Sequence, residues 1–366
     1  MERAATEDAA RNFELDEGRL GDPEEESLRL NSPASAMGLY GGGVRMHDRL
    51  GEVAGDPMGL AEREGFVDVA DAAPALPVTA APVPQWRQML EVFAQNRLAI
   101  VSTIVLAVIV LGCFIGPHFY VTNQTNANTI IYATPNLAPS SAHWLGTDFQ
   151  GWDVLGRIMY AGQYSLSLGL FAGLITIVIG TVYGMAAGFF GGVPDAVMMR
   201  FIDAALSIPY LFLLVALVTI FHNTTTFLIL VIGLTGWWGN SRIIRGDALV
   251  IRDLEYSLAA TSMGARRTHV IRRHVFPNSM GNIVTVGTFS VADAILALSA
   301  LGFIGFGIQQ PAVDWGTQMF YGSQQLINGY WWEFYPVAVT FVAVILCINY
   351  MGDALRDVFE VRLRQR

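Results

Sequence analysis

The chain contains no lysine, and all 22 of its basic residues are arginine. A P-loop needs a lysine that reaches the nucleotide phosphates, so a standard P-loop is excluded. Schiff-base catalysis through a lysine amine is excluded for the same reason. The chain is therefore not expected to be an ATPase or a Schiff-base enzyme in its own right.

Cysteine and charge are also scarce. Cys113 and Cys347 lie in apolar segments without a nearby His or Cys at metal-ligand spacing, so we expect small buried hydrophobes and no metal site. Charged residues make up 14% and hydrophobic residues 53%, whereas a soluble domain carries about 25% charged residues. Long apolar runs account for the difference. The composition predicts a multispan membrane protein.

The acidity of the chain is concentrated near its start. Residues 1–84 hold 17 of the Asp and Glu residues and 7 arginines, whereas residues 85–366 hold 14 and 15. The first region is rich in Ala, Gly and Pro and poor in aromatics, so it cannot bury enough apolar surface to fold. We expect residues 1–84 to be a disordered acidic cytoplasmic tail. This tail is not a signal peptide, because it opens acidic and has no apolar core.

Residues 85–97 form a short amphipathic segment that is expected to lie on the membrane surface. Six apolar spans follow, each near the ~20 residues that cross a bilayer core. They cover about residues 98–117, 164–188, 201–221, 226–244, 280–305 and 335–354. Glycines at 233, 236 and 239 interrupt the fourth span. The sequence thus predicts an all-α integral membrane protein with six transmembrane helices in residues 98–366.

Arginine placement predicts the orientation of these spans. Seven arginines lie in residues 240–277 and four follow the last span, whereas residues 119–163 hold only Arg157 and residues 306–334 hold none. The positive-inside rule places the loop after span four and both termini in the cytoplasm.

The cytoplasmic loop at residues 254–278 reads LEYSLAATSMGARRTHVIRRHVFPN. Ala259 and Ala260 allow close approach to another backbone, and Gly264 can take positive φ and end a short helix. Arg266 and Arg267 can pair with lipid phosphates or an acidic partner. Pro277 suits the first turn of span five.

This loop resembles the EAA loop, by which the membrane subunits of ABC importers engage their ATPases. The pattern has two alanines, a glycine four positions on and a proline thirteen residues after that glycine. Here these are Ala259, Ala260, Gly264 and Pro277. The family usually has Glu at the position of Leu258, and Glu255 offers a carboxylate three residues earlier on the same helical face. The resemblance implies that the loop at residues 254–278 contacts an ATPase. The residues that it assigns to this contact are Glu255, Leu258, Ala259, Ala260, Gly264, Arg266, Arg267 and Pro277.

The chain as a whole resembles the second permease subunit of dipeptide, oligopeptide and nickel ABC importers, the group close to the dipeptide permease C subunit. The resemblance covers about residues 86–364. The blocks that carry it are Asn96–Ala99 (NRLA), Trp144–Asp148 (WLGTD), Gly151–Arg157 (GWDVLGR), Tyr164–Leu170 (YSLSLGL), Ala187–Asp195 (AGFFGGVPD), Met199–Asp203 (MRFID), Leu301–Gly316 (LGFIGFGIQQPAVDWG), Gly352–Asp357 (GDALRD) and Arg362–Arg364 (RLR).

The resemblance implies the type I permease fold of ABC importers and a bacterial cell (inner) membrane location. It implies as partners a second homologous permease, two ATPase subunits, an extracytoplasmic substrate-binding protein and the lipid bilayer, with no nucleic acid. No cofactor is expected in this chain, because ATP and Mg²⁺ belong to the ATPases. The chain is expected to be non-catalytic, and peptides are the commonest cargo of the group.

Two positions in span five keep alternatives open. The family often has Glu where this chain has Leu298, and Asp293 places an ionisable group within the span, where such groups are costly and face a cavity or a partner. Asp293 is therefore a candidate pathway residue. The alternatives are a permease for nickel or another small solute, and an ion-coupled secondary transporter that uses Asp293. An intramembrane enzyme is disfavoured, because the spans show no HExxH, no GxSxG and no paired carboxylates.

Two further expectations concern packing. Gly169, Gly173, Gly180 and Gly184 in span two suit close contact between helices. Arg200 and Asp203, three residues apart at the start of span three, are expected to form a local ion pair at the membrane edge.

Overall fold

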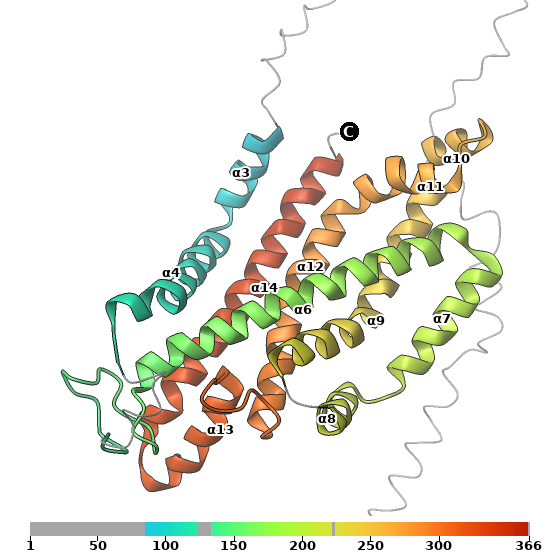
Figure 1. Ribbon diagram of the computed structural model, residues 1–366. Helices are drawn as coiled ribbons and strands as arrows, with labels where there is room; N and C mark the ends of the chain where they lie inside the picture. Colours follow the sequence, from blue (N-terminus) through green and yellow to red (C-terminus); the bar gives the residue numbers. More distant parts are fainter. Residues whose placement is uncertain (1–84, 123–132, 222–223, 365–366) are drawn as a thin grey trace, which may run out of the picture. The chain divides into compact units, whose positions relative to one another are not determined.

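The computed structural model describes residues 85–122, 133–221 and 224–364. The predicted acidic tail, residues 1–84, lies outside the described residues. Every regular element in the described ranges is helical, and the one β feature there is an isolated bridge between Thr147 and Asp153. The prediction of an all-α membrane protein is confirmed (Figure 1).

The long helices are α4 (Arg97–Phe119), α6 (Val154–Phe190), α9 (Thr225–Arg252), α12 (Phe276–Phe303) and α14 (Tyr335–Arg364). The shorter ones are α3 (Gln85–Gln95), α7 (Gly192–Leu206), α8 (Tyr210–Ile220), α10 (Glu255–Ser262), α11 (Arg267–Val270), α13 (Trp315–Gln325), the π-helical turn η3 (Ile271–Val275) and the 3-10 turns η4 (Leu326–Asn328) and η5 (Trp331–Glu333). Within the described residues five helices are long and apolar enough to cross a membrane, or six if the bent pair α7–α8 is one span.

The third span differs from its prediction. We expected one continuous helix over residues 201–221, but the structure has α7 and α8 bent by 77° at residues 207–209. Pro209 explains the break, because a proline disfavours the helical conformation at the residue before it and supplies no N–H for a helical hydrogen bond. The fourth span is a single helix, and its three glycines do not interrupt it.

Helix α6 is the central element of the bundle and packs against α9 along one side and α12 along another (Figure 1). Its glycines face these neighbours. A Cβ at Gly184 would lie 2.4 Å from the carbonyl oxygen of Ser241 on α9, and one at Gly173 would lie 2.9 Å from Cα of Val291 on α12. The predicted close packing at these glycines is confirmed.

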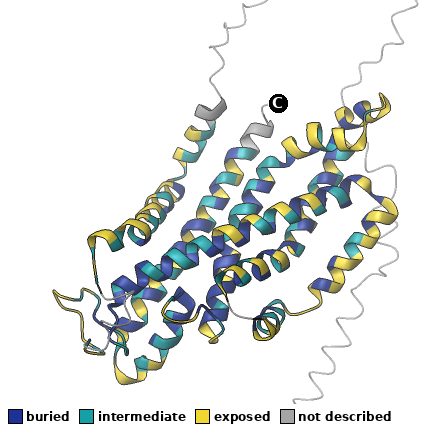
Figure 2. Cartoon of the chain, viewed as in Figure 1, coloured by how far each residue is buried: buried dark blue, intermediate teal, exposed yellow. Residues whose placement is uncertain are grey.

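The two largest apolar clusters form around α6. One joins its first half to α4, α13 and α14, with the fully buried Trp315 at its centre. The other joins α6 to α8, α9 and α12, and contains the fully buried Leu298. Helix α4 instead keeps much of its apolar surface exposed (Figure 2), as expected for a helix that faces lipid.

Helix α7 is held to α9 by ion pairs. Arg245 contacts Asp195 through Nε–Oδ1 at 2.5 Å and Nη2–Oδ2 at 2.6 Å, and Arg242 pairs with Asp203. The predicted pair of Arg200 with Asp203 is therefore wrong. Two residues three apart on one helix are neighbours, but α9 brings Arg242 to the same carboxylate from across the helix interface.

Helix α12 continues a longer apolar helical run. The segment Arg267–Phe303 comprises α11, the π-helical turn η3 and α12, and it spans 37 residues. Pro277 lies in the first turn of α12, directly after η3. Because a proline ring clashes with the carbonyl four residues earlier, a wider π turn at this place accommodates it. The start of the fifth span is thus joined to the predicted cytoplasmic loop without a break.

Candidate functional site

Helix α10 contains four of the residues that the sequence singles out, which are Glu255, Leu258, Ala259 and Ala260. Its buried face consists of Ser257 and Ala260, and Ala260 packs with Phe189, Ala248 and Val270. Its other face is exposed at Glu255, Leu258 and Ala259. The helix is therefore fixed to the bundle along one side and presents the other side freely.

A Schellman motif ends α10. Gly264 has φ of +84°, its N–H donates to Thr261 O at 3.0 Å, and the N–H of Ala265 donates to Ala260 O at 3.1 Å. Ala265 also packs against the cluster that contains Ala260, which is the apolar contact expected of this motif. The positive φ inferred for Gly264 from the sequence is confirmed, and it sets the direction in which the chain leaves α10.

The arginines after α10 are exposed. Arg266 is the N-cap residue of α11, and Arg267 lies 5.8 Å from the ring centroid of Phe190. Arg272 and Arg273 follow on η3, and within the described residues none of these four arginines forms an ion pair. They are available to an acidic surface or to lipid phosphates.

The outer face of α10 is more apolar than the sequence reasoning anticipated. Leu258 is 52% exposed, Met263 is 83% exposed, and Leu254 and Tyr256 are each 41% exposed. Figure 2 shows the region around α10, at one end of the bundle, as largely exposed. Leu254, Tyr256 and Met263 were not predicted as site residues, although apolar residues within an arginine-rich loop were a signal for them. Such a surface has the composition of a protein contact.

Asp293 lies apart from this surface. It follows Pro277 by 16 positions, so the helical rise places it about 24 Å further along α12. There it lines a cavity of about 620 Å³ together with residues of α8 and α9, among them Tyr210, Thr235, Trp238 and Asn240. Sequence reasoning missed these neighbours. A Cβ at Gly239 would meet no atom within 4 Å, so this glycine, read from the sequence as an interruption, borders open space.

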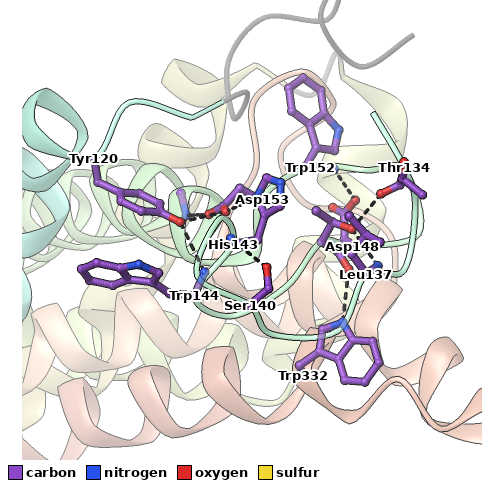
Figure 3. A network of polar contacts seen from close by, with 12 residues as sticks. Tyr120, Thr134, Leu137, Ser140, His143, Trp144, Asp148, Trp152, Asp153 and Trp332 are labelled. Carbon is purple, nitrogen blue, oxygen red and sulfur yellow. Dashed lines mark hydrogen bonds and ion pairs between the residues drawn. The ribbon is translucent and has the colours of Figure 1, made fainter. Parts of the chain in front are cut away.

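At the N-terminal end of α6, a polar network fixes the segment that precedes this helix (Figure 3). Asp153 is fully buried and caps α6 by accepting the N–H of Gly156 at 2.7 Å. Its other oxygen accepts the hydroxyl of Tyr120 at 3.0 Å and lies 2.8 Å from Nδ1 of His143. The indole N–H of Trp332 donates to Thr147 O at 3.2 Å. The network therefore ties the segment to both α4 and η5.

Buried acids stabilise the turns of this region. Asp148 accepts the N–H groups of Gln150 and Trp152 at 2.9 Å each, and burial raises its pKa to about 6. Asp314 is fully buried, accepts the N–H groups of Thr317 and Ile308, and has its pKa raised by the same desolvation. Arg157 donates to Pro311 O at 2.7 Å. These bonds give the WLGTD, GWDVLGR and AVDWG blocks a structural role.

Comparison with known proteins places this architecture in a family. Residues 180–365 match the family described as the binding-protein-dependent transport system inner membrane component, and residues 84–139 match the N-terminal TM domain of oligopeptide transport permease C. The first match covers half of the chain. The chain belongs to the inner-membrane components of binding-protein-dependent transport systems, and the prediction of a permease subunit of an ABC importer is confirmed.

Individual relatives agree with this assignment. The chain is 35% identical to the dipeptide transport system permease protein DppC of Bacillus subtilis, over 76% of this chain and 85% of the relative. It is 32% identical to the oligopeptide transport system permease protein OppC of Haemophilus influenzae, over 76% and 89%. It is 31% identical to OppC of Bacillus subtilis, over 81% and 96%. A chain of the MetNI methionine ABC transporter in inward-facing conformations is 18% identical, with a TM-score of 0.42 over 55% of this chain and 96% of that chain.

Proposed function

We propose that this chain is one of two related permease subunits of an ATP-driven importer of short peptides. The names of its relatives, which are dipeptide and oligopeptide permeases, support the peptide substrate. ATP and Mg²⁺ bind to two partner ATPases, and the chain itself is non-catalytic. An extracytoplasmic binding protein delivers the substrate, and both termini lie in the cytoplasm, consistent with the arginine distribution.

Helix α10 is the contact with an ATPase in this proposal. The observation that carries it is the combination of a buried side, at Ser257 and Ala260, with an exposed side, at Leu258 and Met263. Glu255, Ala259, Arg266 and Arg267 border the exposed apolar residues, and Pro277 joins the loop to α12. A rigid helix of this kind transmits a push, because one face docks on the partner while the other is packed on the bundle.

The mechanism is alternating access. Closure of the ATPase dimer moves α10, and α12 moves with it because the two are joined through α11 and η3. The spans then switch from an inward-open to an outward-open arrangement, each favoured by a different partner. Among the described residues that line the cavity at Asp293, there is no second acid and no histidine. This favours ATP-driven transport over an ion-coupled relay, which relies on chains of such groups.

The test is purification of the tagged chain from membranes of its own host, followed by identification of co-purifying proteins and measurement of ATP-driven peptide uptake. We expect a second permease and ATPase subunits to co-purify. Leu258→Asp places a charge on the proposed contact and is expected to lower ATPase recovery at least about tenfold, since an unpaired interface charge costs several kcal/mol. Recovery of the chain without any ATPase would contradict the proposal.

Ile327→Asp is the matched control. Ile327 is 92% exposed and lies in η4, near α13 and away from α10 (Figure 1). The same change of charge on an exposed apolar residue should leave ATPase recovery unchanged there. Equal losses in the two variants would mean that the added charge acts on membrane insertion, not on a contact at α10.

A further inference from the structure

The cavity at Asp293 has the size and lining of a ligand site. Its volume of about 620 Å³ lies in the range of small-molecule pockets, which are mostly apolar with a few polar groups. Apolar side chains from four helices help to form its walls, including Leu206 on α7, Leu211 on α8, Trp238 on α9 and Leu296 on α12. Walls of this kind accept side chains of many shapes by apolar contact.

Asp293 is the one formally charged residue among the described residues that line the cavity. Its side chain is exposed in this chain, and in the described part it takes part in no hydrogen bond or ion pair. Tyr210, a neutral phenol, lines the same cavity. The carboxylate therefore faces the cavity without a compensating cation from the described residues.

The polar neighbours of Asp293 are already engaged elsewhere. Thr235 donates to Val231 O at 2.6 Å, Asn240 donates to Ser290 Oγ at 2.7 Å, and Ser290 donates to Val286 O at 2.7 Å. The arginines of α9 point to other acids, since Arg242 pairs with Asp203 and Arg245 with Asp195. The carboxylate of Asp293 is thus left without a partner in a cavity between the predicted spans. An ionised acid in such a place is costly unless it has a positive partner.

We propose that Asp293 binds the primary ammonium group of the transported peptide while the apolar walls hold its side chains. This inference rests on the proposed function and adds to it the group that is recognised and the residue that recognises it. An ammonium offers three N–H donors and a positive charge, which match an acceptor-only carboxylate. Attraction in a cavity with apolar walls is stronger than in water, so a single contact orients a peptide whose side chains vary.

Charged thiol reagents test this directly in the complete complex in host membranes. Gly239→Cys places a thiol on the cavity wall where a Cβ meets no atom. The native Cys113 and Cys347 are buried, so the parent complex serves as the blank. The rate of labelling is measured with a cationic trimethylammonium methanethiosulfonate and with an anionic sulfonate analogue. We expect Asp293→Asn to lower the ratio of cationic to anionic rates by about tenfold, because one nearby charge is removed.

Asp247→Asn is the matched control for this ratio. Asp247 is a carboxylate on α9 that bonds to Asn282 and does not line this cavity, so the ratio should not change. A dipeptide with a free amino group should also slow labelling of the thiol introduced by Gly239→Cys, whereas its N-acetylated form should not. Asp293→Asn should remove that difference, and Asp293→Glu should retain it.

Two results would overturn the inference. One is a ratio of labelling rates that Asp293→Asn leaves unchanged. The other is an unreactive introduced thiol together with loss of the second permease from the Asp293→Asn complex, which would assign Asp293 to an ion pair between subunits. The proposed function is tested separately by peptide uptake through the parent complex. If the parent complex takes up peptide and either of these results is found, the proposed importer function stands and only the proposed role of Asp293 is refuted.

Discussion

Arg245 on α9 binds the carboxylate of Asp195 on α7 in a bidentate manner, through Nε–Oδ1 at 2.5 Å and Nη2–Oδ2 at 2.6 Å. The Asp195 side chain is only 12% exposed. A bidentate pair of a guanidinium and a carboxylate fixes the relative orientation of the two side chains and also neutralises their charges. The bond anchors the first half of the bent pair α7–α8 to the central helices, while α8 forms part of the wall at Asp293.

Removal of this anchor should loosen α7. Asp195→Ala leaves the guanidinium of Arg245 without its acceptor, which costs about 1–3 kcal/mol. The expected result is a lower melting temperature in detergent and faster trypsin cleavage after the exposed Arg200 of α7. Asp203→Asn is the comparison, because the pair of Asp203 with Arg242 is about half exposed and is worth under ~1 kcal/mol. Equal effects of the two variants would refute the special role of Asp195.

The second prediction concerns the contact of α6 with α9. Gly184→Leu has no space to occupy, since even a Cβ would lie 2.4 Å from a backbone oxygen. We expect a loss of several kcal/mol or no folded protein, because overpacking alone costs about 1–3 kcal/mol and backbone atoms cannot yield as side chains do. Gly246→Ala on α9, where a Cβ meets nothing within 4 Å, should be neutral or stabilising. Thermal unfolding of the two variants checks the difference.

Gly264 gives a third prediction, because its φ of +84° disfavours residues with a side chain. Gly264→Ala should destabilise the end of α10 by about 1 kcal/mol, whereas Gly264→Asn should be tolerated better, since Asn enters the left-handed region more readily. The measurement is the ATPase rate of the complex and its coupling to uptake. We expect poorer coupling in the alanine variant with unchanged recovery of ATPase. Indistinguishable Ala and Asn variants would argue against backbone strain as the cause.

The fourth prediction is a pH dependence from Asp148. Burial raises the pKa of Asp148 from 3.8 to about 6, so the folded chain holds this proton more tightly than the unfolded chain. The contribution of Asp148 to the free energy of unfolding should therefore fall as pH rises from about 4 to about 6. Burial also raises the pKa of Glu333 to about 7, so Glu333 extends the fall to about pH 7. The contribution of Asp148 is at most about 3 kcal/mol. Melting temperatures across this pH range report it.

Asp148→Asn removes this contribution. The amide oxygen of Asn can still accept the N–H groups of Gln150 and Trp152, while the titrating proton is gone. The variant should lose part of the pH dependence and be relatively more stable at pH 7 than the parent. Asp314 also has a raised pKa but is present in both proteins, so it cancels in the comparison. The raised pKa of Glu333 should fall slightly in the variant, because the Asp148 charge that helps to raise it is gone. A parallel pH profile in the two proteins would rule Asp148 out.

The sequence predicted those features that depend on local chemistry. Gly264 ends α10 as its conformational freedom suggests, and the glycines of span two lie at helix contacts. Five of the six spans are long helices, since apolar length alone predicts them. The apolar face at Leu258 and Met263 was harder to foresee, because which side of α10 is buried depends on how it packs against α6 and α9.

Features that depend on distant neighbours were missed or wrong. Asp203 pairs with Arg242, which lies 39 positions away, and not with the nearby Arg200. The bend at Pro209 was overlooked because the hydropathy of residues 201–221 is continuous across it. Without that bend the cavity beside Asp293 could not be derived, since Pro209 and Tyr210 help to line it. Knowing that a residue lies in a helix does not tell which side chains of other helices it contacts.

The unbroken run from Arg267 to Phe303, in which α12 follows α11 and η3, forms a long helical arm. At about 1.5 Å per residue, its 37 residues reach about 55 Å. A tilt of only about 5° about the end next to α10 sweeps the other end through about 5 Å, roughly one helical turn. In the proposed mechanism, a small shift of the ATPase contact at Leu258 therefore becomes a larger displacement at the far end of this run, where the segment that holds Asp314 begins.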